Sequence, residues 1–315
     1  RGLGDVYKRQ YLNRKRSYRD LPLRYNETST LFRNEASGEM HGLIRVRQFT
    51  ISEGHLMCTP EQLEDEFRKC LELAIFMLKT LGLYEDVSYR FSQWDPNDRA
   101  KYIGTEEQWN EAQGLMERIL NHLEIPYEIG IGEAAFYGPK LDIQIKNVYG
   151  KEDTLITIQI DQMLAEQFGM VYTDKDGKQK TPCIIHRTSI GCYERTLALL
   201  IEKYAGAFPL WLAPVQVKLL PIADRHLDYL YEVKKQLEDK GFRCEVDDRS
   251  EKIGYKIREA QLEKVPYMVV VGDKDIENNT ISIRKRKEGD LGAMTVEQFL
   301  EKIVPDRDNK VIDLS

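Results

Sequence analysis

The sequence predicts an α+β fold, in which an antiparallel sheet with flanking helices is followed by a small α/β domain. Three amphipathic helices begin at capped threonines, and runs of alternating apolar and polar residues lie before the first helix and after the second. After about residue 210 the pattern changes to short apolar strands separated by helices. Alternating strands are typical of antiparallel sheets with one packed and one open face, whereas strand-helix-strand order is typical of parallel pairing.

The three helices share one N-terminal signature. They start at Thr59, Thr105 and Thr295, and each threonine is followed three residues later by glutamine. This capping box satisfies backbone donors that the first turn leaves unpaired. In the first helix Pro60 suits the first helical position, and Gly82 suits the end.

Strands are expected where apolar and polar residues alternate, because successive side chains of a strand point to opposite faces. Such runs are GLIRVRQFTI (42–51), GPKLDIQIKNV (138–148) and TLITIQID (154–161). In the last run Thr157, Gln159 and Asp161 share one face, which makes that face a candidate site, since buried polar side chains need partners. The first ten residues show neither a helical nor a strand pattern.

The C-terminal part alternates strands and helices. Strands are expected over 215–222, 242–248, 266–272 and 280–286, and helices over 225–241, 250–265 and from Thr295. The boundary with the first domain is expected near Pro209 to Pro214.

Composition excludes several classes of protein. The net charge of −6 on 315 residues gives no strong overall attraction to nucleic acid, so any RNA contact would come from local patches. No apolar run approaches the roughly 20 residues that span a bilayer, and no secretory signal is visible. Five scattered cysteines, an odd number, predict a reducing cytoplasm.

The loop between Phe32 and Phe49 carries arginines at both ends. Arg33 and Arg45 flank a flexible middle, and Glu35 lies between them. Arginine suits planar, bidentate contact with phosphate, so this hairpin could hold a polyphosphate. The alternative is a surface hairpin whose solvated charges contribute little.

Other polar residues leave two interpretations open. Lys140 could meet a carboxylate or phosphate, or it could be a solvated turn lysine. Arg195 opens a helix against the dipole preference, which favours a bound anion or a salt bridge to Glu194. His55 and His186 are too few for a metal site on their own, because catalytic zinc usually takes three protein ligands.

Four motifs in order resemble those of the threonyl-tRNA synthetases, which are class II aminoacyl-tRNA synthetases. They are FRNE…RVRQF, AFYGPKLDI, HRTSIGCYERTLALLIEKYAGAFPLWLAPVQV and EKIGYKIREAQLEKVPYMVVVGDKD. The resemblance covers about residues 16–305. It implies a class II catalytic domain over 11–211, an anticodon-binding domain over 212–315, and a ligase of protein biosynthesis. That ligase would activate L-threonine with ATP to threonyl-adenylate and transfer it to tRNA(Thr).

The resemblance also assigns roles at the nucleotide. Arg33 would hold the α-phosphate of ATP and the substrate carboxylate, Glu35 would accept from the adenine amine, and Arg45 would contact the γ-phosphate. Arg195, in the motif GCYER, would stack on adenine and contact phosphate. Arg33 and Arg195 are therefore the expected catalytic residues, with Mg²⁺ accompanying ATP.

Threonine selection follows from the same resemblance. The residues expected to bind threonine are Glu53, Tyr137, Lys140, Thr157 and Gln159. The family uses one zinc ion per subunit, and His55 and His186 match two of its three ligands. An ion that binds the amine and the hydroxyl of threonine would reject valine, which shape alone rejects poorly.

The third zinc ligand of the family is a cysteine shortly before SYRDLPLR, and it would align near Gly4. No cysteine precedes Cys58. We therefore expect residues 1–10 to be a non-family extension, the first class II motif to be missing, and zinc binding and activity to be weak in this chain. Cys58 or Cys183 is the alternative ligand. The full-length protein is expected to carry the missing cysteine and to form a homodimer.

In the C-terminal domain Arg258, Asp275 and Arg286 match positions that contact the anticodon. Basic residues are grouped over 252–258 and in RKRK (284–287), which suits single-stranded bases, although a solvated edge strand would look similar. The alternatives to a ligase are a catalytically impaired fragment that acts as a tRNA- or mRNA-binding module, and a prolyl- or seryl-type relative. The arginines favour the enzyme, and the two histidines argue against proline.

Overall fold

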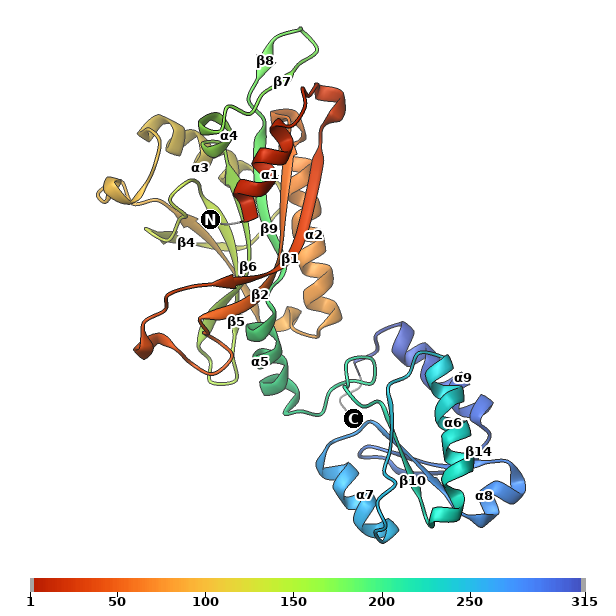
Figure 1. Cartoon of the computed structure of the whole chain (residues 1–315). Helices are drawn as coiled ribbons and strands as arrows, with labels where there is room; N and C mark the ends of the chain where they lie inside the picture. Colours follow the sequence, from red (N-terminus) through yellow and green to blue (C-terminus); the bar gives the residue numbers. More distant parts are fainter. Residues whose placement is uncertain (1–2, 313–315) are drawn as a thin grey trace. The chain divides into compact units, whose positions relative to one another are not determined.

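The computed structural model describes residues 3–312, and their contacts divide the chain into two compact units (Figure 1). One unit extends to Leu199 and the other begins at Leu200, within the helix α5 (Tyr193–Tyr204). The domain limits expected from the sequence, 11–211 and 212–315, stay predictions. The α+β class with a following small α/β domain is confirmed.

A mixed but mainly antiparallel sheet forms the centre of the first unit. Neighbouring strands are antiparallel except for β3 and β4, which are parallel. From one edge to the other, the described strands are β1 (Leu23–Phe32), β2 (Gln48–Cys58), β9 (Cys183–Cys192), β6 (Glu152–Asp161), β5 (Lys140–Lys146), β3 (Val87–Gln93) and β4 (Tyr127–Ile131).

The hairpin between β1 and β2 differs from the prediction. The sequence analysis missed β1, whose residues alternate between half-buried and exposed because the strand lies at the edge of the sheet. The strand expected over 42–51 begins only at Gln48, and residues 42–47 belong to the connecting loop. Arg45 and Arg47 alternate with apolar residues, which is the pattern of a strand. Among the described residues, however, no strand pairs with residues 42–47.

The two faces of the sheet have opposite character. Ile143, Ile158 and Ile185 are completely buried on one face, where the helix α2 (Leu63–Thr80) contacts β9, β6 and β2. Polar residues such as Thr157 and Gln159 occupy the other face, as the alternation predicted. The helices therefore stabilise the sheet from one side and leave the polar side open for a ligand.

The capping signals are confirmed with one shift in position. Thr105 and Gln108 form a capping box at the start of α3 (Glu106–His122). The box at Thr59 precedes a single 3₁₀ turn over Pro60–Gln62, and α2 begins only at Leu63. Gly82 has a φ of +71°, the left-handed conformation that glycine adopts easily at a helix end.

The N-terminal segment is helical, contrary to the pattern expected for the first ten residues. The helix α1 (Leu3–Leu12) buries Tyr7 and Tyr11, whose spacing of four residues was the helical signal that the sequence analysis missed. Residues 1 and 2 lie outside the described part.

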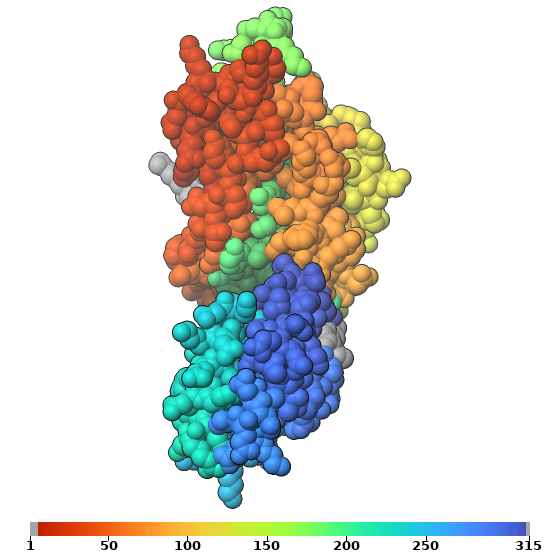
Figure 2. Space-filling model, turned by 90° about the vertical axis from the view of Figure 1, so that its right-hand side faces the viewer, coloured from red at the N-terminus to blue at the C-terminus, as the bar shows by residue number. Residues whose placement is uncertain are grey.

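The first unit also contains the short helix α4 (Leu164–Gln167). A hairpin of β7 (Tyr172–Thr173) and β8 (Gln179–Lys180) projects from this unit (Figures 1 and 2).

The second unit is a small α/β domain, as predicted. Its described strands are ordered β11 (Cys244–Val246), β10 (Val217–Pro221), β12 (Tyr267–Val271), β13 (Ile281–Lys285) and β14 (Gly289–Met294). The first three are parallel, and β13 and β14 continue antiparallel. The helices are α6 (Leu227–Asp239), α7 (Ile253–Leu262), α8 (Asp273–Asn278) and α9 (Val296–Asp308). The apolar sides of α6, α7 and α9 share a core with the strands.

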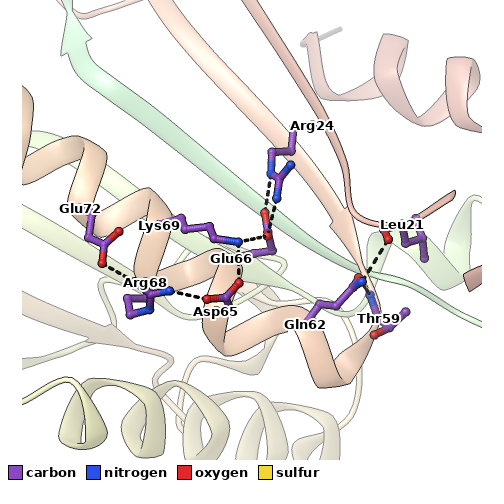
Figure 3. Close-up of polar contacts among 9 residues, drawn as sticks. All are labelled: Leu21, Arg24, Thr59, Gln62, Asp65, Glu66, Arg68, Lys69 and Glu72. Atoms are coloured by element: carbon purple, nitrogen blue, oxygen red, sulfur yellow. Dashed lines mark hydrogen bonds and ion pairs between the residues drawn. The ribbon is translucent and has the colours of Figure 1, made fainter. Parts of the chain in front are cut away.

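An ion pair fastens α2 to the edge strand β1 (Figure 3). The carboxylate of Glu66 is buried and accepts two hydrogen bonds from Arg24, at 2.7 and 2.6 Å, and one from Lys69 at 3.2 Å. Burial raises the pKa of Glu66, but these hydrogen bonds outweigh it, and the pKa lies below its usual value. A carboxylate of this kind stabilises the fold while it is ionised.

Replacing Arg24 with alanine is expected to lower the free energy of unfolding by about 1–2 kcal/mol at pH 7, because one side of the buried carboxylate loses its charge-assisted hydrogen bonds. The difference from wild type should shrink as the pH falls below about 4.3, where Glu66 takes up a proton in the unfolded chain, and it should vanish once the pH is also below the lowered pKa of Glu66 in the folded state. Urea unfolding at several pH values measures this.

Arg68→Ala is the matched control, since Arg68 pairs only with the exposed carboxylates of Asp65 and Glu72 and should contribute less than about 0.5 kcal/mol. Equal losses in the two variants would contradict the role given to the buried pair.

Candidate functional site

A cleft of about 690 Å³ opens on the polar face of the sheet in the first unit. Most of the residues singled out from the sequence line it, although they come from five separate segments of the chain. They are Arg33, Glu35, Arg45, Glu53, Tyr137, Lys140, Thr157, Gln159, His186 and Arg195. The fold therefore brings the residues predicted to bind the nucleotide and the residues predicted to bind threonine together around one cleft.

The hairpin arginines lie at one end of the cleft. The backbone N–H of Arg33 donates to Arg47 O at 2.9 Å, which closes the base of the hairpin, and the guanidinium of Arg33 lies 5.2 Å from the centre of the Phe49 ring. Arg45 lies 3.6 Å from the carboxylate of Glu35. Both a cation and a carboxylate of the hairpin therefore line the cleft.

Arg195 is held by two backbone carbonyls. Its Nε donates to Ile44 O at 3.0 Å and its Nη1 to Thr154 O at 2.5 Å, so the planar guanidinium has a fixed position. The alternative salt bridge to Glu194 is not formed, because that carboxylate accepts from Thr50 N at 2.9 Å instead. A guanidinium anchored at two points suits stacking on a flat ring.

Gly191 is required by the close packing before α5. Its φ is +73°, and a Cβ on this residue would lie only 1.9 Å from Leu155 O. Any other residue would push β9 away from β6. The glycine therefore fixes the turn that delivers Arg195 to the cleft.

The residues expected to bind threonine form two hydrogen-bonded groups. Tyr137 donates its hydroxyl proton to Gln159 Oε1, and burial raises the pKa of Tyr137, so the phenol stays neutral. Lys140 and Thr157 both donate to Asp142, the latter at 2.7 Å. The sequence analysis did not single out Asp142, although a charged residue in the apolar run of β5 was a detectable signal.

Glu53, His55 and His186 form the only cluster of three potential metal ligands found among residues 3–312. Their ligand atoms all lie within 4.8 Å of one another. His55 and His186 are directly opposite each other on β2 and β9, and their rings are 4.5 Å apart. Burial holds the pKa of His55 far below its usual value, so its imidazole is neutral, the form that binds metals.

Two further observations fit a metal ion at this cluster. The Nδ1 atom of His55 is buried without a hydrogen-bond partner among the described residues. His186 Nε2 lies 2.9 Å from the buried carboxylate of Asp161, the usual arrangement behind a metal-bound histidine. Two histidines and a carboxylate are a donor set that zinc accepts.

The alternative cysteine ligands are not supported. Cys58 and Cys183 belong to β2 and β9 but lie three residues away from the histidines, and neither belongs to the cluster. Burial raises the pKa of Cys183 to about 11 and that of Cys58 further, which disfavours the thiolate needed for metal binding.

The second unit does not bring the three predicted anticodon residues together. Arg258 is exposed on α7. Asp275 follows the end of β12 and accepts from Gly272 N and Ser282 Oγ, both at 2.9 Å. Arg286 directly follows β13, beside the start of β12, and its side chain donates to Lys264 O and Phe208 O. Asp275 and Arg286 therefore lie beside opposite ends of β12.

A second cavity, of about 550 Å³, lies on this unit and is lined by the predicted basic group RKRK (284–287), which includes Arg286. Lys264, Arg284 and Lys287 line it together with the apolar side chains of Val265 and Met268. The Nε of Arg284 is buried and has no hydrogen-bond partner among the described residues. Cations beside an apolar floor suit a base with its phosphate. Lys256, by contrast, is buried and donates to Asp247 O at 3.0 Å, so it does not belong to a basic surface.

Comparison with known proteins identifies both units. Residues 4–204 match the family model described as tRNA synthetase class II core domain (G, H, P, S and T), and residues 216–305 match the anticodon binding domain. No helix within residues 3–312 is long and apolar enough to cross a membrane.

The chain is similar to named threonine–tRNA ligases and to a solved structure. The ligase of Clostridium perfringens (strain SM101 / Type A) is 62% identical over 294 residues, which are 93% of this chain and 46% of that protein. The ligase of Clostridium botulinum (strain Eklund 17B / Type B) is 64% identical over 288 residues, 91% and 45% of the two chains. The chain also matches the crystal structure of the RNA binding domain of threonyl-tRNA synthetase from Cryptosporidium parvum Iowa II, with a TM-score of 0.88 and 32% sequence identity. The match covers 96% of this chain and 75% of the chain in that structure. The chain spans about half the length of the curated relatives it matches.

Proposed function

Since this chain belongs to the threonyl-tRNA synthetase family of class II synthetases, we propose that it activates L-threonine with ATP and transfers it to tRNA(Thr). The main support for the proposal is that the hairpin arginines and the polar residues of β2, β5, β6 and β9 line the same cleft. A protein that only binds RNA has no need of such a cleft.

ATP would lie at the hairpin end of the cleft. Arg33 would hold the α-phosphate and the threonine carboxylate, Arg45 would hold the γ-phosphate, and Glu35 would accept from the adenine amine. Arg195, already fixed by two carbonyls, would stack on adenine. Because these groups are in place before the reaction, they would position the carboxylate for in-line attack and stabilise the charge that develops at phosphorus. Mg²⁺ would enter with ATP.

Threonine would lie beside the three-ligand cluster. We propose that Glu53, His55 and His186 hold zinc, with Asp161 orienting His186. When bound, the ion would supply a Lewis acid to which the amine and the hydroxyl of threonine can bind. Tyr137, Lys140, Thr157 and Gln159 would surround the rest of the amino acid.

ATP–pyrophosphate exchange with each of the twenty amino acids tests the proposal. Threonine should give the fastest exchange. Serine, which lacks one methyl group, should be disfavoured by about 10–200-fold, and valine, which lacks the hydroxyl, by up to about 10⁴-fold. Exchange that prefers another amino acid would overturn the proposal, and an inactive chain that still binds tRNA would instead support a tRNA- or mRNA-binding module.

The second unit would bind the anticodon stem-loop. We propose Arg258 and the cavity lined by Arg284 and Arg286 as its contacts, whereas Asp275 would act through the loop that it holds. Arg284→Ala is expected to weaken tRNA(Thr) binding about tenfold, the contribution of one charge-assisted contact, while exchange without tRNA stays unchanged. Filter binding measures the affinity, and an unchanged Kd would contradict the assignment.

We also propose a cytoplasmic location and, for the full-length protein, a homodimer. The five free cysteines support a reducing compartment. The homodimer is supported by the resemblance to the family, and sedimentation of the full-length protein would test it.

A further inference from the structure

Asp142 is a buried carboxylate directly behind the cleft. Its side chain is only 1% exposed, and the residue lies on β5 between the neighbouring strands β3 and β6. Asp142 does not line the cleft, but both Lys140 and Thr157 do. Whatever Asp142 does for a ligand, it must do through these two side chains.

Three side chains donate to this carboxylate. Oδ2 accepts from Ser92 Oγ at 2.6 Å and also pairs with the Lys140 ammonium. Oδ1 accepts from Thr157 Oγ1 at 2.7 Å, since Thr157 lies directly opposite on β6. A buried charge is tolerated only with such partners, so the arrangement is strongly fixed.

The direction of these hydrogen bonds decides what the cleft can offer a ligand. A hydroxyl has one proton to donate, and Thr157 gives it to Asp142, so toward the cleft its oxygen can only accept. Tyr137 gives its proton to Gln159 and is likewise left as an acceptor. The ammonium of Lys140 has three protons and uses one on Asp142, so it remains a donor.

We propose that Asp142 is a positioning residue that sets the hydrogen-bonding polarity of the amino-acid pocket. It keeps Thr157 an acceptor for the substrate ammonium or hydroxyl, and it holds the ammonium of Lys140 in place as a donor for the substrate carboxylate or phosphate. The inference rests on the proposed function for the identity of the substrate. An asparagine at this position has the same shape, but its amide can donate to Thr157 and turn the hydroxyl proton toward the incoming ammonium.

The hold on Lys140 can be tested without enzyme activity. In Asp142→Asn, modification of Lys140 by trinitrobenzenesulfonate, followed by mass spectrometry, should be about tenfold faster, because the charge-assisted bond that restrains the amine is lost. Lys151, which lines the same cleft, should react at an unchanged rate and serves as the internal standard. Equal rates for Lys140 in the two proteins would overturn the proposal.

The effect on the substrate is tested by exchange kinetics. Asp142→Asn should raise KM for threonine about 10–100-fold, which one or two charge-assisted hydrogen bonds account for, and leave KM for ATP within about twofold. A fall in kcat with both KM values unchanged would mean a merely structural role and would overturn the proposal. Asp247→Asn is the matched control, because Asp247 is likewise a buried carboxylate paired with a cation, that of Arg249, but lies in the second unit. It should change neither KM.

If Asp142→Asn does not fold, as judged by its melting temperature, Thr157→Val carries the test. It should raise KM for threonine and leave the labelling of Lys140 at the wild-type rate, since Asp142 still holds the ammonium. Faster labelling, or an unchanged KM, would overturn the proposal. A wild-type chain without threonine-dependent exchange would refute the proposed function, and the labelling result would then decide by itself whether Asp142 holds Lys140.

Discussion

Arg33→Ala is expected to lower kcat/KM for threonine-dependent pyrophosphate exchange about 10²–10⁴-fold. Arg33 lies at the base of the hairpin and lines the cleft, where it would hold both the α-phosphate and the threonine carboxylate. Two charge-assisted contacts of about 1.5–3 kcal/mol each account for that range. Exchange rates at saturating and at limiting ATP, compared with wild type, give the measurement.

Arg47→Ala is the matched control on the same hairpin. Arg47 does not line the cleft, and its guanidinium donates to Glu35 O at 3.0 Å and to Ser37 Oγ at 3.2 Å. It should therefore cost only about tenfold, through a less ordered loop. Should both variants lose activity equally, the loop as a whole would matter rather than a phosphate contact by Arg33. Undiminished exchange in Arg33→Ala would refute the nucleotide site.

His186→Ala is expected to remove zinc from the protein and with it the rejection of valine. The ring of His186 faces His55 and Glu53 and is oriented by Asp161. Deleting one of three ligands should weaken zinc binding by more than the 10–100-fold expected for Asp161→Asn, which removes only the orienting carboxylate. Zinc content by mass spectrometry after dialysis against a chelator measures this directly, and relative exchange with threonine and valine follows the selectivity.

His226→Ala provides the control for a buried histidine. His226 is as buried as His55 and also lies 2.9 Å from a carboxylate, that of Asp273, but it belongs to no metal cluster within the described residues. The substitution should destabilise the second unit and leave the zinc content unchanged. A His186→Ala protein that retains zinc like wild type, or a wild-type chain that binds none, would contradict the metal site.

Most of the residues singled out from the sequence line the cleft because they stand in local patterns. Arg33, Glu35 and Arg45 are grouped in one loop, and Thr157 and Gln159 alternate along one strand, so their shared face was visible without coordinates. Asp142 was missed because its role depends on donors from two other strands. That convergence is set by strand register, which local patterns do not encode.

The errors in the fold have a related cause. Edge strand β1 lacks a fully buried residue, so its pattern of apolar residues was weak, whereas the arginines over 42–47 alternated without forming a strand. In the second unit, Lys256 was grouped with surface cations, although its helix turns it inward. Charge in a sequence does not reveal which way a side chain points. The basic group over 284–287 was predicted, but the cavity that it lines was not, because the cavity forms where the loop before β12 meets the end of β13.

The register of β2 against β9 shifts between Ile51 and Glu53. After this irregularity along β2, His55 pairs directly with His186. Side chains of a strand change face with every residue, so the gain or loss of one amino acid between the irregularity and Cys58 would turn the imidazole away from its counterpart. The tip of the hairpin at 38–43, before the carbonyl of Ile44 that holds Arg195, has no such constraint. Homologous proteins should accordingly differ in the length of this loop but keep the length of this part of β2. A scan of single-residue insertions should therefore abolish activity in the strand segment and leave it largely intact in the loop.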